Sequence, residues 1–312
     1  MLHNIHYTHL NLGRCGEARS HDRRRSKPTI AYTSTPCAAP VLRRVPPESC
    51  LRLLVYNIRY ATGTGPAFHL PVPGAGYLRS SRRVLDEITQ FIRREDPDLV
   101  GLIEVDTGSV RSGLINQAEY VAQHLGHYTA YECKYGTASL NTQLPIVRKQ
   151  GNAILAAPRV TGERFHYFPT GIKRLIIEME LDEVCVFLVH LSIKYRHRQE
   201  QLRHLHDLIL TAQKPVVVAG DFNTFSGTDE LFLFMRATGL RNANGLGLPS
   251  FPARIPRFEL DFVLVSQEIE VNAFRIPDVR LSDHRPIVCD FRVIPAHEAH
   301  AHETRNPSTL MA

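Results

Sequence analysis

The sequence of 312 residues lacks the features of membrane-spanning, secreted and disulfide-rich proteins. It contains no run of about eighteen apolar residues, so no transmembrane helix is expected. Residues 1–50 contain no apolar segment of about seven or more residues after their charges, which argues against a secretory signal. The six cysteines show no CxxC spacing, which makes disulfides and a zinc site minority interpretations. These absences favour a cytoplasmic protein with no transmembrane segment.

Basic residues are concentrated near the start of the chain. Residues 1–50 hold eight Lys and Arg against three acids, so of the 37 basic and 31 acidic residues in the whole chain, 29 and 28 lie beyond them. This leader therefore contributes +5 of the formal net charge of +6. Proteins that grip a nucleic-acid backbone usually carry the basic surface on the folded domain, so the near-neutral body weakens that interpretation but leaves it open. The leader fits a disordered extension better than an organelle transit peptide.

From Leu51 onward, short apolar runs recur and predict buried strands. The ten predicted strands lie near residues 51–58, 98–103, 128–133, 151–157, 174–181, 184–191, 215–220, 259–265, 270–275 and 286–293. Apolar residues at helical spacing predict helices over 81–94, 195–210 and 229–238. This alternation predicts a sandwich of two sheets with helices on its outer faces. We expect a basic leader (1–50), one domain (51–294) and a flexible tail (295–312), in a monomer.

Polar side chains stand at the ends of the predicted strands. The strongest example is Val216–Asn223, an apolar strand that stops at Asp221 and Asn223. Taken alone, this segment is equally typical of an Asx turn. Directly before the last strand, Asp283 and His284 supply a metal ligand and a general acid or base within one turn.

Four further polar residues follow or interrupt apolar strands, namely Asn57, Glu104, His190 and Asp261. Each one alone is more often a capped strand end or a hydrogen-bonded core group. A carboxylate buried without a partner costs several kcal/mol. We therefore expect Glu104, Asp221 and Asp261 to converge on one polar, metal-bearing site.

The order of these motifs resembles the endonuclease/exonuclease/phosphatase superfamily. The motifs are Asn57, Glu104, Gly151–Leu155, His190–Leu191, Gly220–Asn223, Asp261 and Ser282–His284. They span about Leu51–Val293 and are specific for the fold and general chemistry but poorly specific for the substrate. The resemblance implies an α/β (α+β) fold, a four-layer α/β/β/α sandwich of two mainly antiparallel sheets with outer helices.

The resemblance also implies a phosphoesterase that depends on Mg²⁺ or Mn²⁺ and hydrolyses a P–O bond. Glu104 would hold the ion, with Asn57 and Asp283 beside it, because such ions require hard oxygen ligands. Asp221 would orient or deprotonate the attacking water, and Asn223 would hold a phosphate oxygen.

Two imidazoles and several cationic or amide groups complete the implied site. His284, kept in position by Asp261, would donate to the phosphate, and His190 would be a second imidazole facing it. Three further residues are candidate substrate contacts: Asn152, Arg174 and Arg59.

The substrate stays open between two classes. Arg59 stands where apurinic endonucleases have an acidic residue. The chain therefore resembles the deoxyribonuclease I, sphingomyelinase and phosphatase branches more. A phosphodiesterase acting on nucleic acid or a related diester is favoured. The alternative is a hydrolase of a phospholipid or small phosphorylated metabolite, for which an apolar lip with Phe68 and Phe251, in loops 63–76 and 246–257, would make peripheral membrane contact. A binding module with a decayed site is disfavoured, because the whole set of site residues is retained.

Overall fold

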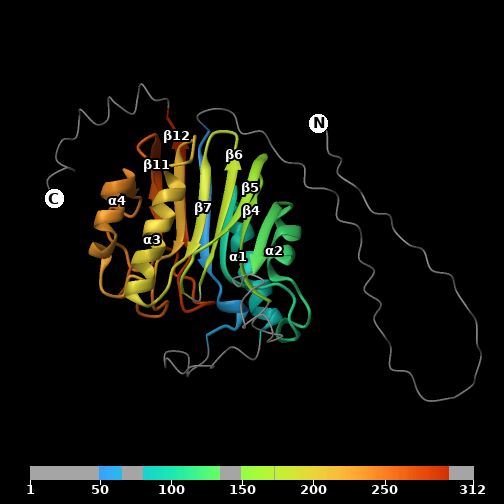
Figure 1. Ribbon diagram of the computed structural model, residues 1–312. Coiled ribbons are helices and arrows are strands. Elements are labelled where there is room, and N and C mark those ends of the chain that lie inside the picture. Colours follow the sequence, from blue (N-terminus) through green and yellow to red (C-terminus); the bar gives the residue numbers. More distant parts are fainter. Residues whose placement is uncertain (1–48, 65–79, 134–148, 172, 295–312) are drawn as a thin grey trace, which may run out of the picture. The chain divides into compact units, whose positions relative to one another are not determined.

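A computed structural model describes residues 49–64, 80–133, 149–171 and 173–294 (Figure 1). All of them belong to one compact unit, Ala39–Ala312. The predicted tail, nearly all of the predicted leader and most of the loops predicted over 63–76 and 136–149 lie outside the described residues.

The described strands form two six-stranded sheets. In spatial order, the first sheet contains β11 (Ile269–Arg275), β12 (Ile287–Val293), β1 (Leu51–Asn57), β2 (Leu99–Asp106), β4 (Gln150–Ala156) and β3 (Tyr128–Cys133). The second contains β5 (Val160–Tyr167), β6 (Leu175–Leu181), β7 (Cys185–His190), β8 (Val216–Asp221), β10 (Asp261–Val265) and β9 (Arg241–Asn242). The pairs β1–β2 and β7–β8 are parallel, and the other neighbouring pairs are antiparallel. The two mainly antiparallel sheets predicted from the sequence are therefore confirmed.

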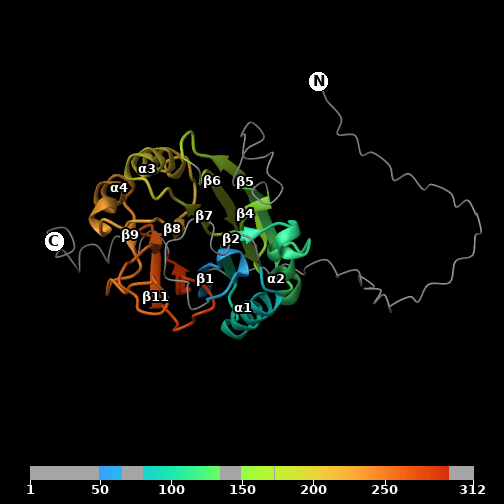
Figure 2. The same ribbon diagram turned by 90° about the horizontal axis from the view of Figure 1, so that it is seen from below.

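Helices cover the outer face of each sheet. Helices α1 (Arg82–Glu95) and α2 (Gln117–Leu125) pack on the first sheet, and α3 (Tyr195–Ile209) and α4 (Phe232–Thr238) pack on the second. Figure 2 shows the two sheets packed face to face between these helix pairs. The arrangement confirms the four-layer α/β/β/α sandwich.

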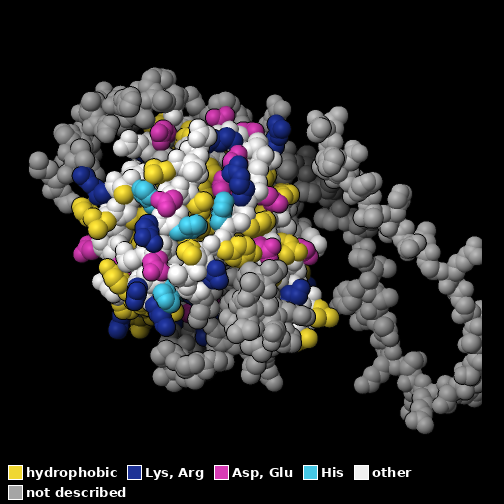
Figure 3. All heavy atoms as spheres, in the orientation of Figure 1, with side chains coloured by type: hydrophobic (Ala, Val, Ile, Leu, Met, Phe, Trp, Pro, Cys, Tyr) yellow, Lys and Arg dark blue, Asp and Glu magenta, His cyan; other side chains and the backbone are white. Residues whose placement is uncertain are grey.

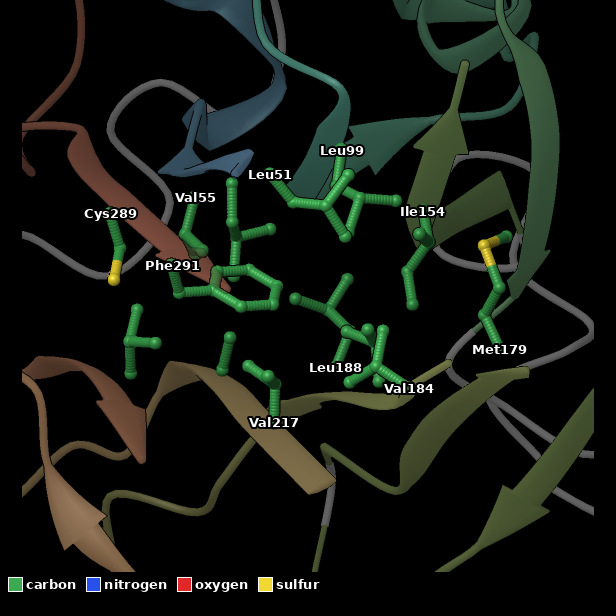
Figure 4. Close-up of a cluster of buried hydrophobic side chains, with 14 of the residues drawn as sticks. Leu51, Val55, Leu99, Ile154, Met179, Val184, Leu188, Val217, Cys289 and Phe291 are labelled. Carbon is green, nitrogen blue, oxygen red and sulfur yellow. The ribbon is translucent and has the colours of Figure 1, made fainter. Parts of the chain in front are cut away.

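The main hydrophobic core lies between the sheets. Val55 and Phe291 of the first sheet point toward Leu188 and Val217 of the second (Figure 4). Each such buried side chain contributes roughly 1.5–3 kcal/mol relative to an exposed one. Because the central strands are covered on both faces, their sequences are apolar without alternation.

Local sequence explains where helix α1 begins and ends. The Ser81 hydroxyl caps the helix by accepting from the Val84 N–H at 3.4 Å. Its apolar stripe, which includes Ile88 and Ile92, is fully buried against the first sheet. Asp96 adopts a left-handed conformation and ends the helix directly before Pro97.

The structure contains three elements that the sequence did not predict. Strand β5 is an edge strand whose sequence is largely polar, β9 has two residues, and α2 has nine, so none gave a clear periodic signal. The helix predicted over 229–238 is α4 preceded by a 3₁₀ turn, Thr228–Leu231.

The described residues include four of the six cysteines. Cys50, Cys133, Cys185 and Cys289 are free thiols, and the last two are buried in strands. Across the ranges that the structure covers, no helix is long and apolar enough to cross a membrane.

Candidate active site

Three predicted site residues lie in one row across the second sheet. His190, at the end of β7, pairs in register with Asp221, at the end of β8. Asp261, at the start of β10, pairs with Asp221 from the other side. Lateral neighbours in a sheet project from the same face. The row therefore gathers an imidazole and two carboxylates at one end of the sheet.

Gly220 allows this close arrangement. A Cβ atom at this position would lie 1.9 Å from the Val189 carbonyl oxygen in β7. Its φ of +144° is also a conformation that side chains disfavour. Only glycine lets β7 and β8 approach here, which sets the contact between His190 and Asp221.

The Asp221 carboxylate joins the two sheets. Asn57 of β1 donates through Nδ2 to Asp221 Oδ2 at 3.2 Å, and His190 Nε2 lies 3.2 Å from the same oxygen. The other oxygen accepts from the Asn223 N–H at 3.0 Å, while Asn223 Nδ2 donates to the Leu191 carbonyl. These side chains are at most 3% exposed. Burial by itself raises the pKa of Asp221, but the imidazoles of His284 and His190 outweigh it, so the pKa lies below its usual range.

His284 is held by a second buried carboxylate. Its Nδ1 donates to Asp261 Oδ2 at 2.7 Å, and the Ser250 hydroxyl donates to the same oxygen at 2.6 Å. Its Nε2 lies 3.8 Å from Asp221 Oδ2. Burial alone would lower the pKa of His284, but Asp261 and Asp221 raise it to about 10. The imidazole is therefore a cationic donor at neutral pH.

The three predicted oxygen ligands lie along one edge of the first sheet. Strands β12, β1 and β2 are neighbours, so Asp283 before β12, Asn57 at the end of β1 and Glu104 in β2 lie along one edge. Glu104 is the extra residue of a β-bulge, with φ of +57°, between two residues that pair with β4. A bulge re-aims its side chain, and the Glu104 N–H donates to Asn152 Oδ1 at 3.2 Å.

Of the two predicted cationic contacts, Arg59 lies beside a predicted metal ligand, whereas Arg174 bonds to the backbone of its own loop. Arg59 Nε lies 3.6 Å from Asp283 Oδ2. Arg174 Nε donates to the Phe168 carbonyl oxygen, which anchors it in the loop before β6. Its neighbour Lys173 lies against His190 Nε2, with its Nζ 4.0 Å from Glu104 Oε1.

Sequence reasoning missed Lys173 and Ser250. Neither interrupts an apolar strand, so neither gave the signal that marked the other residues. The available signal for Lys173 was its position directly before β6, since the start of this strand lies beside the end of β7.

A buried ion pair supports the loop that carries Arg59. Residues Arg59–Ala61 form a turn in which all three have positive φ, an uncommon conformation for side-chain-bearing residues. Arg111 packs its guanidinium on the Tyr60 ring at 4.1 Å and donates to Asp106 at 2.7 Å, both side chains being fully buried. This support keeps the turn beside the proposed metal ligands.

A family model described as "Endonuclease/Exonuclease/phosphatase family" matches residues 54–284. The chain belongs to this family. Its matched region includes the residues of the site from Asn57 to His284. Enzymes of the endonuclease/exonuclease/phosphatase family are generally hydrolases, including nucleases and phosphatases, and typically depend on a divalent metal ion.

The chain is also similar to one curated relative and to three solved structures. It is 29% identical over 137 residues to "Uncharacterized protein YbhP" of Escherichia coli strain K12, matching 38% of this chain, and it spans about half, 51%, of that relative's length. An endonuclease/exonuclease/phosphatase from Beutenbergia cavernae is similar with a TM-score of 0.62 at 21% identity, over 79% of this chain and 72% of that one. D. rerio TDP2, solved with a single-strand DNA product, is similar with a TM-score of 0.56 at 14% identity, over 79% of this chain and 100% of that one. The Bacteroides thetaiotaomicron mannosyl-6-phosphatase Bt3783 is similar with a TM-score of 0.56 at 15% identity, over 77% of this chain and 99% of that one. At these identities the structures show the fold alone.

Two groups of this family member are candidates for the metal ion. The ligand atoms of Asp221, Asp261 and His284 all lie within 4.8 Å of one another, so this group could hold a metal. However, His284 Nδ1 already donates to Asp261, so only Nε2 of this imidazole could serve as a ligand.

The oxygen set of the first sheet fits Mg²⁺ or Mn²⁺ better. Glu104 and Asp283 contribute carboxylates and Asn57 a carboxamide oxygen, which are the hard ligands these ions prefer. The carboxylate side chains are 13% and 23% exposed, so they can be reached from solvent.

Proposed function

We propose that the chain is a metal-dependent phosphodiesterase that hydrolyses a P–O bond by in-line attack of a water molecule oriented by Asp221. The observation that carries the proposal is the position of Asp221, which contacts Asn57 of one sheet and His190 of the other while lying 3.8 Å from His284. A carboxylate whose pKa lies below its usual range stays ionised and can accept a hydrogen bond from water.

Glu104, Asp283 and Asn57 would hold Mg²⁺ or Mn²⁺. When bound, the ion supplies positive charge to offset the charge that develops on the phosphate oxygens. Arg59, 3.6 Å from Asp283, adds a fixed cation beside this set.

The donors around Asp221 would bind the phosphate. Cationic His284, held by Asp261, donates through Nε2 to a non-bridging oxygen, and His190 with Lys173 adds donors on the other side. As the water oxygen bonds to phosphorus and the ester P–O bond breaks, these donors stabilise the added negative charge.

Two amide side chains and Arg174 complete the proposed substrate contacts. Asn152 Nδ2 is buried and has no hydrogen-bond partner within the described part of the chain, which leaves a donor for a ligand. Asn223 Nδ2 donates one N–H to Leu191 and retains a second for a phosphate oxygen. The Arg174 guanidinium would approach from the loop before β6.

The second candidate is a hydrolase of a phospholipid or small phosphorylated metabolite. Basic and acidic side chains are interspersed over the face in Figure 3, in keeping with the near-neutral body. A structural neighbour, Bt3783, is a mannosyl-6-phosphatase. Of the predicted membrane lip, Phe68 lies outside the described residues, whereas Phe251 packs on His284 as part of the site.

Hydrolysis by the purified full-length chain tests the proposal. The panel contains single- and double-stranded DNA, RNA, bis-p-nitrophenyl phosphate, sphingomyelin and inositol polyphosphates, each with Mg²⁺, Mn²⁺ or EDTA. Cleavage of DNA, RNA or bis-p-nitrophenyl phosphate that EDTA abolishes supports the proposal. Turnover of sphingomyelin or of phosphomonoesters alone supports the second candidate, and turnover that persists in EDTA contradicts both.

A further inference from the structure

A series of aromatic rings in contact with one another extends from His284 to the surface. The Phe251 ring packs on the His284 imidazole with centroids 4.9 Å apart. Phe225 packs edge-on against Phe251 at 5.8 Å and against Phe258 at 5.6 Å. Phe225 and Phe258 are 39% and 40% exposed. Apolar ring surface is therefore available beside the group proposed to bind the phosphate.

The rings are carried by loops that the sheet topology brings together. Strands β7, β8 and β10 are adjacent, and their active-site ends continue into segments 191–194, 222–227 and 250–260. Phe225 lies in the second segment and Phe258 in the third. Tyr195, directly after the first segment, is 58% exposed at the start of α3.

Exposed cations lie in the first and third of these segments and at the start of α3. They are Lys194, Arg196, Arg254 and Arg257. No carboxylate in the described ranges forms an ion pair with any of the four, whereas Arg280 and Arg285 are both paired with Asp278. We call these four cations, with Tyr195, Phe225 and Phe258, the aromatic–basic rim. Its positive charges are not neutralised within the part of the chain that the structure describes.

We propose that the aromatic–basic rim binds single-stranded nucleic acid, with unpaired bases stacked on Phe225 and Phe258 and neighbouring phosphates on Arg254 and Arg257. This inference rests on the proposed function and names its substrate class. A base stacked on an aromatic ring contributes about 1–3 kcal/mol. Bases in a duplex are already stacked on each other, so the rim selects unpaired bases. The bound strand presents a phosphodiester to His284.

The packing of the rings favours a nucleic acid over a lipid surface. Side chains that enter a membrane project freely from the protein, whereas Phe225 and Phe258 are packed edge-on and stay less than half exposed. Rings held in place lose little freedom when a planar base stacks on them.

Fluorescence anisotropy with the full-length chain tests the rim. A fluorescein-labelled oligothymidylate, the corresponding duplex, and vesicles of phosphatidylcholine with phosphatidylserine are compared in EDTA, where the proposed function predicts no cleavage. The variant F225A/F258A is expected to bind the single strand about tenfold more weakly or worse. The variant R254Q/R257Q leaves the ring packing intact and is expected to reduce the slope of log K against log salt by about 0.7 for each lost contact.

Matched controls lie at the other end of the sandwich. Leu210→Ala removes an exposed apolar side chain just beyond the far end of α3, and Arg159→Gln removes an exposed cation between β4 and β5. Both are expected to bind like the wild type. Unchanged binding by both rim variants, equal binding of the duplex, or binding to vesicles without binding to the oligonucleotide would overturn the inference.

A separate assay distinguishes this inference from the proposed function. If the wild type hydrolyses bis-p-nitrophenyl phosphate in an EDTA-sensitive reaction but does not bind the oligonucleotide, the rim inference alone is wrong. If rim-dependent binding occurs without turnover of any phosphate ester, the rim inference stands and the proposed function is wrong.

Discussion

Asp221 and His284 carry opposite charges at neutral pH, and this division determines their chemistry. The pKa of Asp221 lies below its usual range and that of His284 is raised to about 10, because each is buried beside groups of opposite charge. The carboxylate can therefore accept from water while the imidazolium donates to phosphate.

Metal affinity separates the two candidate metal groups. Glu104→Gln is expected to weaken Mn²⁺ binding about tenfold or more, because it removes the principal carboxylate ligand. His284→Gln is expected to bind Mn²⁺ like the wild type, because the proposed ligand set does not include the imidazole. Isothermal titration calorimetry measures both affinities, with thermal unfolding as a check on the fold. Loss of Mn²⁺ binding in His284→Gln with retention in Glu104→Gln would assign the ion to the other group.

The pH dependence of the rate tests the role of Asp261. Deprotonation of His284 removes a donor, so kcat/KM is expected to fall as pH rises toward about 10. In Asp261→Asn one of the two carboxylates that raise this pKa is neutral, so the alkaline limb moves to lower pH. Profiles of kcat/KM against pH for both proteins provide the comparison. An alkaline limb at the same pH in the variant would show that Asp261 does not act through His284.

At the scale of strands and loops, the site depends on where each strand ends. The apolar run before Asp221 predicted both the strand and its polar end, because a strand covered on both faces can carry polar groups only where it emerges. Lys173 and Ser250 could not be predicted in this way, because each reaches the site through a partner distant in sequence. The bulge at Glu104 also escaped prediction, since its extra residue is defined only by pairing with β4.

The close pairing of β7 and β8 predicts a specific sensitivity at Gly220. Gly220→Ala places a Cβ 1.9 Å from the Val189 carbonyl oxygen and keeps a disfavoured positive φ. We expect it to lower the free energy of unfolding by about 1–3 kcal/mol or more. Gly227→Ala is the matched control, because Gly227 has φ of +118° but no atom within 4 Å of the added Cβ. Urea unfolding measures the free energy of unfolding of both variants. An equal decrease in the two would mean that strain in φ, rather than the clash with β7, limits the packing.

At the scale of the whole molecule, residues from two sheets that are far apart in the sequence come together in one site. Asn57 comes from the first sheet and Asp221 from the second, 164 positions apart, and their side chains are joined by one hydrogen bond. The family resemblance predicted this convergence and the four layers of the fold. It did not predict the aromatic–basic rim, because the segments that carry the rim are brought together only by the order of β7, β8 and β10.

The most direct test of the central claim compares wild type with Asp221→Asn. The measured quantity is kcat/KM for bis-p-nitrophenyl phosphate with Mg²⁺ or Mn²⁺, with circular dichroism and Mn²⁺ affinity as checks on the fold and the metal. The account predicts EDTA-sensitive turnover by the wild type and a loss of about a hundredfold or more in the variant, at similar metal affinity. Equal turnover by the two proteins would contradict the proposal that Asp221 orients the attacking water.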